Sequence, residues 1–266
     1  MASAPATISS DMISKKFAEL KAAGRRALIP YITAGHPDAE RTVELLHALT
    51  EAGADVIELG LPFSDPMADG PVIQASSQRA LDAGMNFDRL LELVARAKAR
   101  VPLVLFSYLN PVLAAGKDAL TRAADAGFHG VLLTDLPVGA DPSREAWVGA
   151  SPLEFIRLVA PTTPPDRMKE IASHGSGFVY LISRLGVTGM RDTMSADLPA
   201  TVKQLREASA LPVAVGFGVS RPEHAATVAR IADGVVVGSA IVKAAGESVD
   251  AAARMTADLR AAIDAA

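Results

Sequence analysis

The chain has 266 residues, half of them hydrophobic, and a formal net charge of −4. This length and apolar content can bury one large core, so we expect a single domain over residues 1–266, with residues 1–8 outside its ordered part. The acidic balance argues against a nucleic-acid or anionic-membrane surface, and the lack of cysteine excludes disulfides and thiolate chemistry.

The start of the chain does not resemble a targeting signal. Residues 1–7 are rich in Ala, Pro and Ser and lack the basic and apolar regions of a secretory signal peptide. No apolar run along the chain reaches the roughly 18 residues that a membrane span requires. We therefore expect a cytoplasmic protein with no membrane contact.

One unit then recurs along the chain: an apolar, β-rich run, a polar or Gly-rich turn, and an amphipathic helical segment. Eight repetitions within roughly 210 residues predict an α/β fold, a (β/α)8 TIM barrel, with a doubly wound open sheet as the alternative. The predicted strands are Ala27–Thr33, Asp55–Gly60, Leu103–Tyr108, Gly130–Asp135, Phe155–Ala160, Gly177–Ser183, Val213–Gly216 and Gly234–Val237. The predicted helices between them include Glu40–Ala52, Phe87–Ala99, Lys117–Ala126, Pro165–Ser173, Leu198–Ala208 and Pro222–Ile231.

Three further helices fall outside this alternation. Ser10–Ala23 places Ile13, Phe17 and Leu20 on one face, so this extra N-terminal helix can cover the bottom of the barrel. A short helix is predicted after the eighth strand, within residues 238–243, and Ser248–Ala265 would close the outer ring.

A glutamate interrupts the second predicted strand. Val56, Ile57 and Leu59 mark a strand buried on both faces, where an ionised carboxylate is costly unless it is paired, hydrogen-bonded or used in chemistry. Glu58 is therefore either a buried acid or a side chain facing water at a frayed strand end. Asp69 follows on the next loop, and two acids at the carboxyl end of a barrel strand favour acid–base catalysis.

Glycine-rich turns follow the last three predicted strands, at residues 183–189, 216–220 and 237–243. Glycine lets backbone N–H groups approach a ligand, and a helix N-terminus adds unpaired donors and a positive dipole end. Barrels often bind phosphate beside strands 7 and 8, so we expect a phosphate site here, built from backbone groups and Ser239.

Two other chemistries are disfavoured by the positions of the histidines and lysines. The five histidines show no metal-ligand spacing. No lysine lies at a predicted strand end, where a Schiff-base aldolase needs one.

Taken in order, these motifs resemble the tryptophan synthase alpha subunit family. The central match is Ile57-Glu58-Leu59-Gly60 followed by residues 62–71, which read PFSDPMADGP, and it is specific. Matching segments follow the same order from about residue 9 to residue 262, at Tyr31–Gly35, Asn110-Pro111, Ser183–Gly189, Gly216–Gly218 and Gly238–Lys243.

The resemblance implies a lyase that cleaves indole-3-glycerol phosphate to indole and glyceraldehyde 3-phosphate by a retro-aldol reaction. Glu58 would be the general acid and base, and Asp69 would bind the indole N–H. Thr188, on the loop 185–198, would meet Asp69 when that loop closes. The indole pocket would be lined by Tyr31, Phe106, Tyr108, Leu132, Leu158 and Tyr180. The phosphate would lie on Gly189, Phe217, Gly218, Gly238 and Ser239.

The resemblance also implies a partner, the beta subunit, in an alpha-beta-beta-alpha heterotetramer. Pyridoxal phosphate would belong to that partner, and this chain would hold no cofactor or metal. A stand-alone indole-releasing lyase, a non-catalytic barrel and another phosphate-binding isomerase or epimerase remain as alternatives. Two segments depart from the family pattern: Gly35-His36-Pro37, and residues 138–152, where the fourth helix is expected to be short or irregular.

Overall fold

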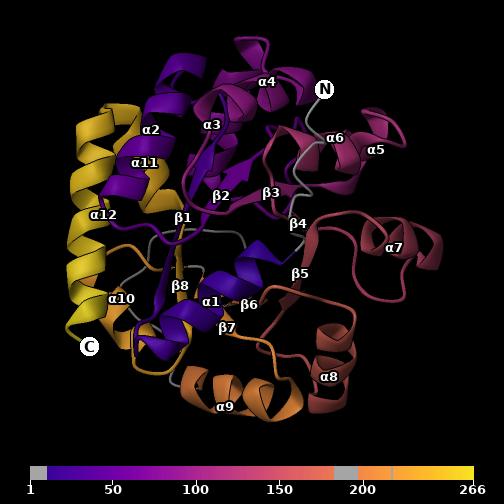
Figure 1. Cartoon of the computed structure of the whole chain (residues 1–266), viewed down its shortest axis with the longest axis vertical. Helices are drawn as coiled ribbons and strands as arrows, with labels where there is room; N and C mark the ends of the chain where they lie inside the picture. The colour runs from indigo at the N-terminus through magenta and orange to yellow at the C-terminus, as the bar shows by residue number, and fades with distance from the viewer. Residues whose placement is uncertain (1–10, 183–196, 217) are drawn as a thin grey trace, which may run out of the picture.

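The computed structural model describes residues 11–182, 197–216 and 218–266. Its eight strands pair in parallel in chain order, and the last pairs with the first to close a barrel (Figure 1). The strands are β1 (Ala27–Thr33), β2 (Ile57–Gly60), β3 (Leu103–Ser107), β4 (Gly130–Leu133), β5 (Glu154–Val159), β6 (Val179–Ile182), β7 (Val213–Gly216) and β8 (Gly234–Val237). The barrel prediction is confirmed, and the open-sheet alternative is wrong.

Helices surround the barrel, and the first of them lies across the end at which the strands begin. They are α1 (Met12–Ala22), α2 (Ala39–Glu51), α3 (Pro71–Asp82), α4 (Phe87–Ala97), α5 (Leu109–Ala114), α6 (Ala119–Ala126), α7 (Pro142–Gly149), α8 (Pro165–Ser173), α9 (Leu198–Ala208), α10 (Pro222–Ala229), α11 (Ser239–Glu247) and α12 (Val249–Asp264). No helix in the described part of the chain is long and apolar enough to cross a membrane. The predicted strands and helices agree with these bounds within two residues, except that α3 and α5 were not predicted and α11 extends four residues beyond its predicted end.

Alternate strand residues face the barrel interior, and the others pack beneath the helices. Ile29, Val104 and Leu132 belong to the interior cluster, whereas Leu28 and Leu105 belong to the larger layer between strands and helices. The barrel is thus filled in its lower part, which leaves the carboxyl ends of the strands for a binding site.

Helix α1 closes the bottom of the barrel (Figure 1). Its buried residues Ile13, Phe17 and Leu20 join the interior cluster. Glu154 of β5, only 3% exposed, accepts hydrogen bonds from the backbone N–H groups of Ile13 (2.7 Å) and Ser14 (3.0 Å) and from the Ser14 hydroxyl. A side chain about 140 residues away therefore caps this helix N-terminus.

We expect Glu154→Gln to lower the free energy of unfolding by about 1–3 kcal/mol, because the amide nitrogen cannot accept a bond from these buried donors. Glu19→Gln is the control, since Glu19 forms an exposed ion pair with Lys16 on the same helix (3.1 Å) and should change stability by less than about 1 kcal/mol. Urea denaturation measures both variants, and equal effects would contradict the capping role.

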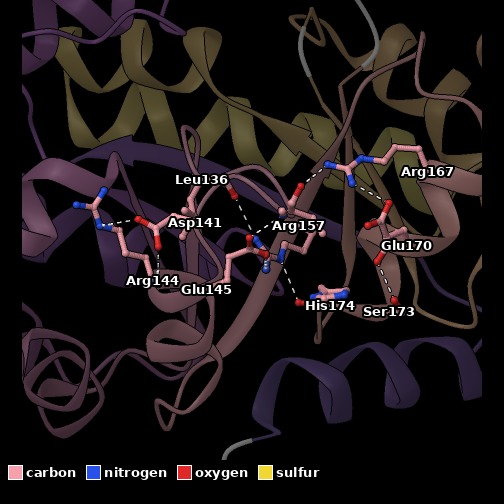
Figure 2. Close-up of polar contacts among 11 residues, drawn as sticks. Leu136, Asp141, Arg144, Glu145, Arg157, Arg167, Glu170, Ser173 and His174 are labelled. Atoms are coloured by element: carbon pink, nitrogen blue, oxygen red, sulfur yellow. Dashed lines mark hydrogen bonds and ion pairs between the residues drawn. The ribbon is translucent and has the colours of Figure 1, made fainter.

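A buried ion pair holds the short helix α7 against β5 (Figure 2). Among the residues of α7, only Glu145 and Val148 are buried. Arg157 of β5 is 4% exposed and donates to Glu145 (2.9 Å), to the Leu136 carbonyl (3.1 Å) and to the His174 carbonyl (3.0 Å). The helix expected to be short or irregular within residues 138–152 is thus α7, and it is short. It is held in position mainly by the ion pair between Glu145 and Arg157, because it has no broad apolar face.

Candidate active site

Glu58 points into the barrel near the carboxyl end of β2. It is 1% exposed, and its Oε1 has no hydrogen-bond partner among the described residues. Burial raises the pKa of Glu58 to about 8. The carboxyl group is therefore mostly protonated at neutral pH and can act as an acid. The alternative of a glutamate facing water at a frayed strand end is wrong.

Asp69 lies on the loop between β2 and α3 and is also buried. The Tyr108 hydroxyl accepts a hydrogen bond from the Ala68 N–H (2.9 Å) and donates one to the Asp69 carboxylate. Burial raises the pKa of Asp69 to about 6, and the bond from Tyr108 opposes this rise. Asp69 is thus mostly ionised at neutral pH, so the two buried acids carry opposite protonation states there.

One cavity at the carboxyl end of the barrel connects these two acids. Its lining comes from six strands or the loops that follow them, and from the first turns of α3 and α11. The lining residues are Tyr31, Glu58, Asp69, Ile73, Phe106, Tyr180, Gly218, Val219, Ser220, Val236, Gly238, Ser239 and Ala240. The Tyr31 and Phe106 rings meet edge to face, with centroids 5.1 Å apart, and form an aromatic wall beside Glu58.

Two glycines make room for the tyrosines of this cavity. A Cβ atom on Gly60 would lie 2.1 Å from the Tyr31 hydroxyl oxygen, and one on Gly216 would lie 2.2 Å from the Tyr180 hydroxyl oxygen. Each hydroxyl therefore packs directly against the backbone of a glycine at the end of a strand, in the space that a side chain would otherwise occupy. Burial raises the pKa of each tyrosine, so both remain protonated near neutral pH.

The first residues of α11 line another part of the same cavity. Gly238 is the N-cap of this helix and forms no side-chain cap, and Ser239 and Ala240 follow it into the cavity wall. The first N–H groups of a helix have no partner within the helix and favour an anion. Gly218, with φ of +93°, lies beside them and adopts a backbone conformation that favours glycine.

The structure brings together most, but not all, of the predicted site residues. Tyr31, Phe106, Tyr180, Gly218, Gly238 and Ser239 line the cavity with the two acids. Tyr108 holds the Asp69 loop, Leu132 is fully buried in the interior cluster, and Leu158 packs against that cluster. Thr188, Gly189, Phe217 and residues 185–196 of the predicted loop lie outside the described residues.

Two lining residues, Ile73 and Val236, lie outside every segment predicted to form the site, whereas Val219, Ser220 and Ala240 were not named singly but lie within the predicted phosphate-binding segments 216–220 and 237–243. Inward alternation along β8 could have identified Val236. Pro71 at the first helical position could have revealed α3, and with it Ile73. In the described ranges, no three His, Asp or Glu side chains gather as a metal site requires.

Comparison with known proteins gives a consistent result along the chain. The family model described as tryptophan synthase alpha chain matches residues 17–265. A tryptophan synthase alpha chain from Desulfatibacillum aliphaticivorans is 47% identical over 241 residues, which cover 90% of this chain and 91% of that protein. One from Arabidopsis thaliana is 44% identical, with 89% and 87% covered.

Solved structures agree with the sequence comparison. Tryptophan synthase subunit alpha from Legionella pneumophila superposes with a TM-score of 0.87 at 38% identity, covering 96% of this chain and 99% of that one. A chain of Mycobacterium tuberculosis tryptophan synthase superposes with a TM-score of 0.88 at 36% identity, covering 95% and 98%.

Proposed function

The chain belongs to the tryptophan synthase alpha chain family, and from this premise we propose how its residues perform the reaction of that family. It is a carbon–carbon lyase of tryptophan biosynthesis that cleaves indole-3-glycerol phosphate to indole and glyceraldehyde 3-phosphate. The observation that carries the proposed mechanism is the pair Glu58 and Asp69, two acids in one cavity with pKa values of about 8 and about 6.

Protonated Glu58 would first donate its proton to C3 of the indole ring, which is a weakly basic carbon and needs a positioned acid. The ring then becomes an indolenine-like cation, and the Asp69 carboxylate would accept a hydrogen bond from its N–H. The Glu58 carboxylate would next take the proton of the glycerol hydroxyl adjacent to C3. The carbon–carbon bond breaks, its electron pair returns to the ring, and the aldehyde leaves.

The phosphate would bind at the α11 end of the cavity. Gly218 and Gly238 offer backbone close to the ligand, and the Ser239 hydroxyl can donate to a phosphate oxygen. Tyr31, Phe106 and Tyr180 would surround the indole. Gly189, Phe217 and Thr188 complete the proposed site by resemblance to the family.

The family and the solved tryptophan synthase structures imply a beta-subunit partner. We further propose an alpha-beta-beta-alpha assembly in the cytoplasm, with pyridoxal phosphate in the beta subunit and no cofactor in this chain. The alternative, a stand-alone lyase that releases indole, is distinguished from this assembly by its activity, because it would cleave the substrate at full rate without a beta subunit.

A pH profile of cleavage tests the mechanism. We expect kcat/KM to be bell-shaped, because activity needs Asp69 ionised and Glu58 protonated. It should fall below about pH 6 and above about pH 8, the pKa values of the two acids. Indole release from purified chain, with and without a tryptophan synthase beta chain, gives the measurement. Asp69→Asn should remove most of the activity and also the fall below about pH 6, which we call the acid limb. A flat profile of the wild-type protein would refute the roles assigned to Glu58 and Asp69.

A further inference from the structure

The first turn of α3 determines where Asp69 lies. This helix begins at Pro71, two residues after Asp69. The Gln74 side chain donates to the Asp69 carbonyl (2.8 Å), and the Gln74 N–H donates to the Gly70 carbonyl (2.9 Å). A shift of this turn relative to the barrel would therefore move Asp69 with it.

Two buried hydroxyls fasten this turn to β1. Ser76 of α3 is 2% exposed and donates to the carbonyl of Ile73 (2.8 Å). Its Oγ lies 2.7 Å from Oγ1 of Thr33, the last residue of β1, which is 1% exposed. A hydroxyl has one hydrogen, and that of Ser76 is given to Ile73, so Thr33 donates to Ser76.

This contact also links the turn to residues that line the cavity. Thr33 Oγ1 lies 3.5 Å from the hydroxyl oxygen of Tyr31, which is paired in register with Glu58 on the neighbouring strand. Ile73, which receives the Ser76 hydrogen bond, lines the cavity itself. Because water has no access to these hydroxyls, loss of one would leave its partner unsatisfied.

We infer that Thr33 and Ser76 are positioning residues for the cleavage reaction, whose hydroxyl contact holds the first turn of α3, and hence Asp69, in place. The inference rests on the proposed role of Asp69 at the indole N–H. It assigns no substrate contact to either hydroxyl. A displacement of about 1 Å at a reacting group can cost as much as about a hundredfold in rate, so a buried anchor of this kind can matter strongly.

A pair of substitutions at Thr33 separates the hydroxyl from the shape of the side chain. Thr33→Val keeps the shape and should lower kcat about tenfold, whereas Thr33→Ser keeps the hydroxyl and should recover at least half of the wild-type kcat. KM should change by less than about twofold in both variants, because neither hydroxyl contacts the substrate. Ser76→Ala should match Thr33→Val, and the double variant should be no slower than either single variant.

The pH profile gives a readout that mere packing would not move. In Thr33→Val and Ser76→Ala, a loosened Asp69 loop admits water, so the acid limb should move below pH 6 while the limb near pH 8 stays. Ser77→Ala is the control, because Ser77 is the adjacent buried serine of α3, 3% exposed, and it should leave kcat and both limbs unchanged.

Each outcome decides one question. A kcat within twofold of wild type in Thr33→Val and in Ser76→Ala, or equal losses in Thr33→Val and Thr33→Ser, overturns the inference. Ser76→Ala decides alone if Thr33→Val fails to fold by circular dichroism. Full activity of Asp69→Asn, by contrast, overturns the proposed function and leaves the hydroxyl contact a matter of stability.

Discussion

Replacing Glu58 with glutamine is expected to lower kcat for indole-3-glycerol phosphate cleavage at least about a hundredfold, the low end for loss of a general acid–base group. Glutamine has the same shape but cannot transfer a proton at either step. Indole release under substrate saturation measures the effect. Glu154→Gln is a matched control, since it alters another buried glutamate at the opposite end of the barrel and should leave kcat within about threefold. Comparable losses in the two variants would refute the role of Glu58.

The same substitution should make the fold more stable in alkaline solution. Burial raises the pKa of Glu58 from 4.5 to about 8, so the folded state holds a proton that the unfolded state releases at lower pH. This contribution to stability is complete below about pH 4.5 and is lost as the pH rises through about 8. We therefore expect Glu58→Gln to unfold at higher urea concentration than wild type at pH 8.5, with a smaller difference at pH 5.

Breaking the Arg157–Glu145 pair should give the largest loss of stability among the substitutions considered. Either Arg157→Met or Glu145→Leu leaves the other charge buried without its partner, which costs about 3–5 kcal/mol. The double variant should regain part of this loss, because no lone charge remains, although the Leu136 and His174 carbonyls still lose their donor. Urea denaturation of all four proteins gives the coupling energy.

Arg144→Met supplies the control for this cycle. Arg144 of α7 forms an ion pair with Asp141, the N-cap of that helix (3.2 Å; Figure 2), and its loss should cost less than about 1 kcal/mol. Strictly additive effects of Arg157→Met and Glu145→Leu would show that the buried charges do not depend on each other.

The barrel was predictable because its signals are local. Apolar runs ended by glycine turns gave the bounds of β1, β7 and β8 without error. Helix α3 was missed because Gly70 and Pro71 were interpreted as loop, although proline also suits the first turn of a helix. The sequence also left the burial of Glu58 undecided, since alternation along one strand does not show which end is open to water.

Contacts between distant segments were not predictable from patterns of this kind. Arg157 and Glu145 lie on different elements, and only the packing of α7 on β5 brings them together. The contact between Thr33 and Ser76 likewise joins residues 43 positions apart, and although Thr33 stands in the matching segment Tyr31–Gly35, nothing in that segment points to Ser76. The two catalytic acids could be predicted from the sequence, but the residues that hold them in position could be identified only from the structure.

The capping of α1 by Glu154 has a consequence for synthesis on the ribosome. The helix is made first, but the carboxylate that accepts its N–H groups is added 140 residues later. At about 5–20 residues per second, the helix waits roughly 7–28 s for this acceptor. During that interval the N-terminus of α1 lacks its acceptor from the barrel, so the helix can be capped by Glu154 only after β5 has emerged.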